Sequence, residues 1–209
     1  MYNLNTTAAR DADNISNFLK DSGKYKGIFT RAEALLSKKG TKGIGFTFED
    51  ESKRTTKFDL WTLNDKGEEL PSFKHVMAIM TCLRVKTMSP SKAIVERYNF
   101  DDKKTEKVEA EVFSDLMNKP IGLVLRNTEY EKMKDGAKTG ETGWRLELYT
   151  VFDSNEFTAS EVLDKKTTPE KLAVAIASLQ DKPLKVGASA KQQTNSASDV
   201  PAFFDDIGF

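Results

Sequence analysis

Positive side chains and flat aromatic rings gather in the first part of the chain at spacings that suit a strand of nucleic acid. Binding to an unpaired strand requires cations that meet phosphates and rings on which bases stack. Residues 24–42 carry six lysines and arginines against one acid, Glu33. Together with later strand-like segments they define a candidate DNA-binding set: Lys24, Tyr25, Lys26, Phe29, Arg31, Lys38, Lys39, Lys42, Arg54, Lys57, Trp61, Arg97 and Tyr98.

Alternation along the expected strands would place part of this set on one surface. Side chains on a strand point to opposite faces in turn, so Tyr25, Phe29 and Arg31 would share a face. The odd positions of residues 43–47 are glycine or threonine, so they would form the open floor of a groove. Phe29 and Trp61 suit a buried core equally well, and runs of lysine are common on solvated surfaces.

Residue types used for catalysis are scarce. The chain has one histidine, His75, inside an expected helix, and one cysteine, Cys82, among apolar neighbours. A zinc site needs more histidine and cysteine ligands than these, and no phosphate loop of the GxxxxGK[ST] type occurs. Carboxylates are plentiful, but their spacing marks no catalytic or Mg²⁺ pair. We therefore expect a protein that is not an enzyme and that uses no metal or cofactor.

The last five residues combine two acids with a chain-terminal aromatic: Asp205, Asp206, Ile207, Gly208 and Phe209. Such an end can be captured by a basic surface that contains an apolar socket. The sequence before it is rich in small and polar residues and lacks the apolar surface needed to fold. We expect a flexible linker over residues 184–198 and a partner-docking tail over residues 199–209. The alternative is that the phenylalanines of the tail fold back onto the body.

The elements expected to position these residues are mainly β-strands. Strand-like patterns predict strands over residues 24–36, 41–49, 54–63, 93–100, 107–113, 120–130 and 143–152, with a mobile loop over residues 132–142. An apolar stripe predicts a helix over residues 73–84 with Ser72 as its N-cap. A last helix is predicted after a capping box formed by Thr167 and Glu170, and it would stop before Pro183.

A helix between the third and fourth strands of a small antiparallel barrel is typical of the oligonucleotide-binding (OB) fold. The predicted fold is therefore mainly β, an OB-fold-like antiparallel barrel over residues 23–183 with one inserted helix, a C-terminal helix and a flexible acidic tail. The extra strand pair and the last helix would be additions to the barrel. Residues 1–22 are predicted to form a polar N-terminal arm with a short helix that includes Phe18 and Leu19. An unrelated β-sandwich is the alternative architecture.

Composition bounds the class of protein. The chain has 209 residues, 38% of them hydrophobic, which suits one domain and a tail. Its formal net charge is zero, but the tail from Asp199 holds three acids and no base, which leaves 32 bases against 29 acids in the body. A lone cysteine permits no internal disulfide, and the chain has neither an apolar run of membrane length nor the hydrophobic stretch of a signal peptide. We expect a soluble cytoplasmic protein.

The C-terminus resembles that of bacterial single-stranded DNA-binding proteins, which end in a run of Asp followed by Ile-Pro-Phe. Four positions match this ending, and Gly208 stands in place of the proline. The body is loosely similar to the phage-encoded members of this class in the segments 23–25, 37–41 and 116–122.

This resemblance implies a protein that coats transient single strands during DNA replication, recombination or repair in a bacterial host. Its partners would be single-stranded DNA and, through the tail, replication or recombination proteins. A homo-oligomer is one option for its assembly. Two other functions also fit the sequence. One is an adaptor that binds a protein partner without touching nucleic acid, and the other is a mediator of strand annealing during recombination.

Overall fold

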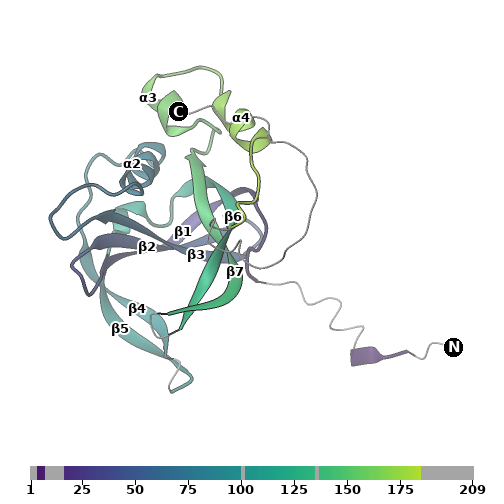
Figure 1. Cartoon of the computed structure of the whole chain (residues 1–209). Helices are drawn as coiled ribbons and strands as arrows, with labels where there is room; N and C mark the ends of the chain where they lie inside the picture. The colour runs from purple at the N-terminus through teal and green to yellow at the C-terminus, as the bar shows by residue number, and fades with distance from the viewer. Residues whose placement is uncertain (1–3, 8–16, 100–101, 135–136, 185–209) are drawn as a thin grey trace, which may run out of the picture.

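The computed structural model describes residues 4–7, 17–99, 102–134 and 137–184, without the side chains of residues 98 and 99. Its architecture is mainly β, with one antiparallel sheet of seven strands (Figure 1). The strands are β1 (Gly23–Leu36), β2 (Lys42–Asp50), β3 (Thr55–Leu63), β4 (Ser91–Asn99), β5 (Lys104–Val112), β6 (Pro120–Lys134) and β7 (Ala137–Phe152). All seven lie where strand-like patterns predicted strands, so the mainly β class is confirmed.

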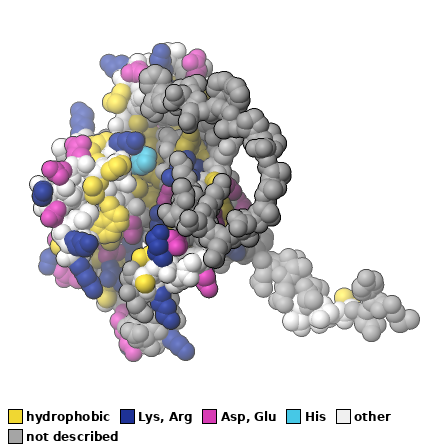
Figure 2. Space-filling model, in the orientation of Figure 1, with side chains coloured by type: hydrophobic (Ala, Val, Ile, Leu, Met, Phe, Trp, Pro, Cys, Tyr) yellow, Lys and Arg dark blue, Asp and Glu magenta, His cyan; other side chains and the backbone are white. Residues whose placement is uncertain are grey.

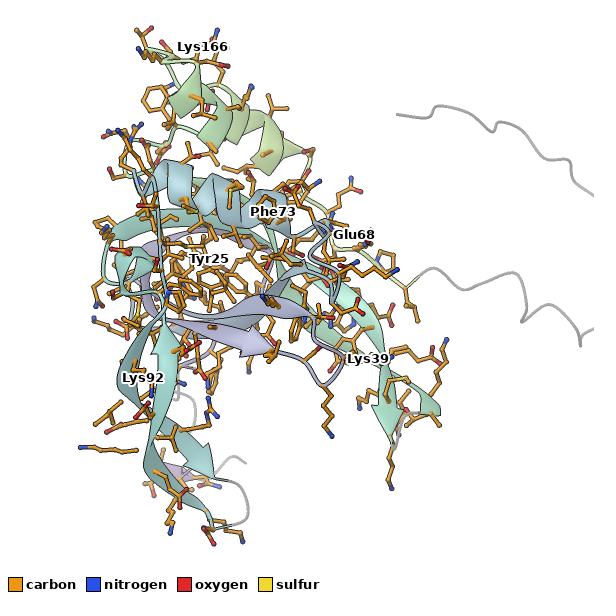
Figure 3. The ribbon with its side chains drawn as sticks, turned by 90° about the vertical axis from the view of Figure 1, so that its left-hand side faces the viewer. Tyr25, Lys39, Glu68, Phe73, Lys92 and Lys166 are labelled. Atoms are coloured by element: carbon orange, nitrogen blue, oxygen red, sulfur yellow. The ribbon has the colours of Figure 1, made fainter. Side chains whose placement is uncertain are left out.

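The long first strand organises the sheet. With 14 residues, β1 holds two partners, β2 along residues 27–36 and β6 along residues 23–28. From β2 the sheet continues to β3, and from β6 it continues to β7. The β4–β5 hairpin joins β1 through one pair, Glu33 with Val112. In both Figure 1 and Figure 3 this hairpin and the outer part of the β6–β7 hairpin extend beyond the same end of the body.

A β-bulge at Thr30 changes which side chains of β1 face the core. Phe29 pairs with Phe48 and Arg31 pairs with Thr47, so Thr30 is an extra residue in the ladder. Phe29 therefore points inward and Arg31 points outward. The expectation that Tyr25, Phe29 and Arg31 share one face is wrong, because strict alternation holds only in a regular strand.

Four phenylalanines from the first three strands form the centre of the core: Phe29, Phe46, Phe48 and Phe58. The ring centres of Phe29 and Phe46 are 4.6 Å apart, and those of Phe46 and Phe58 are 5.5 Å apart. Phe29 is completely buried, so it cannot stack on a base. Its prediction as a DNA-binding residue is wrong.

The central helix, α2 (Phe73–Cys82), follows β3 and contacts both β3 and β7. Val76 and Ile79 bury its apolar stripe in the core. Ser72 occupies the predicted N-cap position, but its side chain makes no capping hydrogen bond. The helix ends before Arg84, which adopts a left-handed backbone conformation with φ of 57°.

Later helical turns are η1 (Ser114–Leu116), α3 (Ala159–Leu163) and α4 (Lys171–Ala177). The predicted capping box of Thr167 and Glu170 is wrong. The box is formed instead by Thr158 and Glu161 at the start of α3. The buried Glu161 carboxylate also accepts the backbone N–H groups of Glu170 and Lys171 at 2.7 and 2.9 Å, so one side chain caps both α3 and α4.

A segment predicted as a helix and a segment predicted as a loop are both extended. Leu19 donates its N–H to the carbonyl of Thr55 (2.9 Å), whose own N–H donates to the carbonyl of Asn17 (2.8 Å). Phe18 and Leu19 are thus extended rather than helical. The predicted loop over residues 132–142 is also wrong, because β6 runs to Lys134 and β7 begins at Ala137.

The linker and tail fall outside the part of the chain that the structure describes. Leu184 is the only residue of the predicted linker within the described ranges, and the docking residues Asp205, Asp206, Ile207, Gly208 and Phe209 lie outside them. No helix among the described residues is long and apolar enough to cross a membrane.

Candidate nucleic-acid interface

The first two lysines of the candidate set are held by an acid. Oε1 of Glu156 lies 2.7 Å from the ammonium nitrogens of both Lys24 and Lys26. The hydrogen bond from Lys24, followed by that from Lys26, holds the pKa of Glu156 at about 2. The Lys24 ammonium also lies 5.4 Å from the ring centre of Phe152. Because Glu156 offsets one of their two charges and holds both ammonium groups, these lysines are poorer phosphate ligands than the sequence suggested.

Arg54 and Tyr25 brace the turn between β2 and β3. The Arg54 guanidinium donates to Oδ2 of Asp50 at 2.9 and 2.7 Å, while Oδ1 of Asp50 accepts the backbone N–H groups of Ser52 and Arg54. The guanidinium carbon is 5.7 Å from the ring centre of Tyr25, whose hydroxyl donates to the carbonyl of Asp21 at 2.7 Å. Both candidates therefore stabilise a turn.

Arg31 and Arg97 converge on Glu33. Arg97, from β4, forms an ion pair with the Glu33 carboxylate, and Arg31 lies 3.8 Å from the same carboxylate. Arg31 also donates to the carbonyl of Glu96. These contacts tie the β4–β5 hairpin to β1 and offset much of the positive charge. The side chain of Tyr98 lies outside the described residues.

The turn between β1 and β2 carries three lysines that form no ion pair among the described residues, although Asp65 packs against Gly40 of the turn. Lys38, Lys39 and Lys42 are exposed, and none of them forms an ion pair with another described residue. Oγ of Ser37 accepts the N–H groups of Lys39 and Thr41, which holds the turn closed. In Figure 3 the turn with Lys39 lies between the β4–β5 and β6–β7 hairpins. Because β1 rises about 3.3 Å per residue, the turn lies on the order of 40 Å from Lys24 at the other end of the strand.

Odd-numbered residues of β3 share the outer face of the sheet with the glycine strip of β2. A Cβ atom at Gly43 would lie 3.0 Å from Cε3 of Trp61, so the half-buried indole covers that glycine. A Cβ atom at Gly45 would lie 3.1 Å from Oδ1 of Asp59. The predicted open floor is therefore partly covered by side chains. The cross-strand pairs are Trp61 with Gly43, Asp59 with Gly45, and Lys57 with Thr47.

The β6–β7 hairpin adds aromatic residues that the sequence-based set omits. Trp144 is 51% exposed, and the guanidinium carbon of Arg145 lies 5.4 Å from the ring centre of Tyr130. Arg145 also donates to Glu147 at 3.0 and 2.7 Å. The signal that could have identified these rings is the Gly-Trp-Arg sequence at 143–145, where an indole adjoins a guanidinium.

A hollow of about 670 Å³ lies between the two edge strands, β3 and β7. We call it the seam hollow. Its lining residues are 57–61 of β3, 145–148 of β7, and Ser72 and His75 at the start of α2. In Figure 2 the chain's only histidine, coloured cyan, lies beside a hydrophobic area with Lys and Arg nearby. Burial, with a smaller contribution from the neighbouring Lys74, lowers the pKa of His75, so its imidazole is neutral near pH 7.

The chain's only thiol, that of Cys82, is buried. Burial is the main cause that raises the pKa of Cys82 to about 12, so its thiol remains protonated and unreactive near pH 7. Among the residues that the structure describes, no group of three or more His, Cys, Asp or Glu side chains could hold a metal ion. The outer face offers aromatic rings and lysines without ion-pair partners, which suit stacking and phosphate contacts.

No protein-family model matches this chain, and no curated protein matches it either.

Proposed function

We propose that this protein binds single-stranded DNA through the outer face of β1, β2 and β3 and through the flanking hairpins, and that it is not an enzyme. One observation carries the proposal. Four exposed lysines form no ion pair with another described residue: Lys57 shares the outer face of β3 with Trp61, and Lys38, Lys39 and Lys42 lie in or beside the β1–β2 turn, next to the start of the glycine strip. Lysines of this kind can meet phosphates, and an accessible indole can stack on a base of any sequence.

The proposal includes an OB-like barrel. Its five strands would be β1, β2, β3, β6 and β7, with α2 after the third strand and the β4–β5 hairpin inserted before the fourth. The pairing of β1 with both β2 and β6 supports this assignment. OB folds bind oligonucleotides on the face of strands 2 and 3 and through the loops after strands 1 and 4. Here those loops would be residues 37–41 and the tip of the β6–β7 hairpin.

The proposed interface differs from the candidate set in two places. It omits candidates near the start of β1 and adds residues of the β6–β7 hairpin. Trp144 and Tyr130 join Trp61 as stacking residues, while the lysines of the β1–β2 turn and Lys57 meet phosphates. Lys24, Lys26 and Arg54 leave the interface because Glu156 and Asp50 hold them.

In the cell, we propose that the protein coats transient single strands in a bacterial cytoplasm during replication or recombination. Residues 199–209 would recruit other proteins of these processes through their acids and the terminal Phe209. The charge distribution supports this division of labour, because three acids fall in the tail while the exposed lysines of the body can meet phosphates.

Substitution of Trp61 tests the proposed face. Trp61→Ala should weaken binding of a fluorescein-labelled oligo-dT, measured by anisotropy, by about fivefold or more, because stacking contributes on the order of 1–3 kcal/mol per base. Val174→Ala removes an exposed apolar side chain of α4, outside the proposed face, and should leave affinity unchanged. If Trp61→Ala lowers the melting temperature by many degrees and leaves the affinity of the folded fraction unchanged, Trp61 belongs to the core and the face is wrongly assigned.

A further inference from the structure

We propose that the seam hollow holds one unpaired nucleobase of the bound strand. This inference rests on the proposed single-stranded DNA binding, and it adds where one base goes and which groups hold it. The hollow differs from the open stacking face because it is bounded on two sides by strand edges and at one end by α2.

The backbone of β3 offers hydrogen-bonding groups to this hollow. Both the N–H and the C=O of Thr55 bond to residues 17–19, on the side away from β2. Antiparallel pairing alternates along a strand, so the N–H and C=O groups of Lys57, Asp59 and Trp61 point the same way. Within the described part of the chain no strand pairs with β3 on that side of residues 57–61. Unpaired donors and acceptors in a row match the polar edge of a base.

The floor and rim of the hollow suit a flat ring. Its lining includes four side chains that are at most 9% exposed and pack in the core: Phe58, Leu60, Leu146 and Leu148. The half-buried rings of Trp61 and His75 also line the hollow. Since the imidazole of His75 is neutral near pH 7, it can stack on a base or form a hydrogen bond with it. An apolar floor with a few polar groups is the usual composition of a small-molecule site.

The length of the free strand edge favours a base over an added peptide strand. At one end residues 17–19 occupy the edge at Thr55, and at the other end Glu69 bridges to Leu63. Only residues 57–61 remain, so a peptide strand that ran past either end of this stretch would meet the chain itself. Among the charged residues that line the hollow, Lys57 is exposed and forms no ion pair with a described residue, so it can meet the phosphate of the nucleotide whose base enters. Arg145 is held by Glu147 at 2.7 Å, and Asp59 is a second acid of the lining.

The chain contains two tryptophans, which makes the test direct. The indole N–H signals of Trp61 and Trp144 can be assigned by NMR with the variants Trp61→Phe and Trp144→Phe. Titration of the full chain with millimolar dAMP, dGMP, dCMP or dTMP should shift the Trp61 signal and leave the Trp144 signal in place. Deoxyribose 5-phosphate, which lacks the base, is the matched control ligand and should shift neither.

A second variant tests the rim. His75→Ala should weaken mononucleotide binding about fivefold or more, whereas Lys74→Ala, the exposed neighbour on the same helix, should not. An equal shift of Trp61 with the sugar phosphate would reduce the hollow to an anion site and overturn the inference. Absence of any mononucleotide shift would also overturn it. When the mononucleotide test fails, an oligo-dT titration separates the two claims. If the oligo-dT still binds in a salt-dependent manner, only the inference about the hollow fails. If the oligo-dT does not bind, the proposed function fails as well.

Discussion

The indole of Trp61 lies directly over Gly43, its partner across the β2–β3 ladder. Any side chain at Gly43 would meet the carbonyl oxygen of Leu60 at 2.8 Å as well as the indole. The glycine therefore sets the height of the ring above the sheet. On the proposed face this contact decides how far the indole projects toward a base.

Gly43→Ala should lift Trp61 and strain the backbone of β3. We expect a loss of about 1–3 kcal/mol in the free energy of unfolding, as for other overpacked sites, with a shift in tryptophan emission and weaker binding of oligo-dT. Gly23→Ala is the matched control, because its Cβ would meet Tyr25 at an ordinary 3.4 Å. Urea unfolding followed by fluorescence measures both variants. Wild-type stability and emission for Gly43→Ala would show that the contact does not set the ring position.

Lysines without partners and lysines held by an acid should differ in their effect on salt dependence. Lys38→Ala with Lys39→Ala should reduce the log–log salt slope of DNA binding by up to about 1.4, since each neutralised phosphate contributes roughly 0.7 on single strands. The double variant Lys24→Ala with Lys26→Ala removes the same charge, but Glu156 holds both ammonium groups and offsets one of the two charges, so its slope should change less. Equal changes from anisotropy titrations at several salt concentrations would contradict the division of the basic residues into two groups.

Glu161 should make the α3–α4 region sensitive to acid. Burial alone raises the pKa of this carboxyl, but hydrogen bonds from Lys171, Glu170 and Thr158 together hold it at about 2, below the ordinary 4.5. Because the folded pKa is depressed, its contribution to stability is fully present above pH 4.5 and is lost as the pH falls toward 2.

Glu161→Gln is expected to flatten this acid-dependent loss. Glu161→Ala should cost about 2–4 kcal/mol at neutral pH, because buried backbone N–H groups lose their acceptor. Thermal melts between pH 2 and 7 measure the dependence. The neighbouring Asp164→Asn is the control, since Asp164 is exposed. An unchanged acid profile in Glu161→Gln would contradict the role given to this carboxylate.

Deletion of residues 199–209 should leave DNA affinity equal or slightly higher. The acids of residues 199–209 compete with phosphates for the lysines of the β1–β2 turn, so their removal relieves a weak competition. Capture of purified bacterial replication or recombination proteins on the immobilised chain should be lost, and removal of Phe209 alone should have the same effect on capture with little change in DNA binding. A deletion that unfolds the body or sharply reduces DNA affinity would show that the tail is packed structure.

The strands were predictable because alternating apolar residues and charged turns are local signals. Ile44, Phe46 and Phe48 alternate with small residues in the sequence, and all three are buried in β2. The bulge at Thr30 leaves no such local signal, and it moves Phe29 into the core and Arg31 to the surface. The hairpin over residues 120–152 was partly missed because its outer residues are polar on both faces, as in a loop.

The candidate site was less predictable than the fold because charge pairing is a long-range property. Nothing in the sequence around Lys24 indicates that Glu156 will lie between it and Lys26, since 132 positions separate Lys24 from Glu156. The same holds for Arg97 and Glu33. A count of lysines along the chain therefore overestimates the positive charge that is available to a ligand.

The central claim, that the body binds single-stranded DNA, is tested most directly by one titration. A fluorescein-labelled oligo-dT and a duplex of equal length are titrated with the full chain at two salt concentrations. We expect tighter binding of the single strand, because stacking needs unpaired bases, and an affinity that falls as salt rises, with a slope of roughly −0.7 per neutralised phosphate. A slope near zero, or equal affinity for the duplex, would contradict the claim.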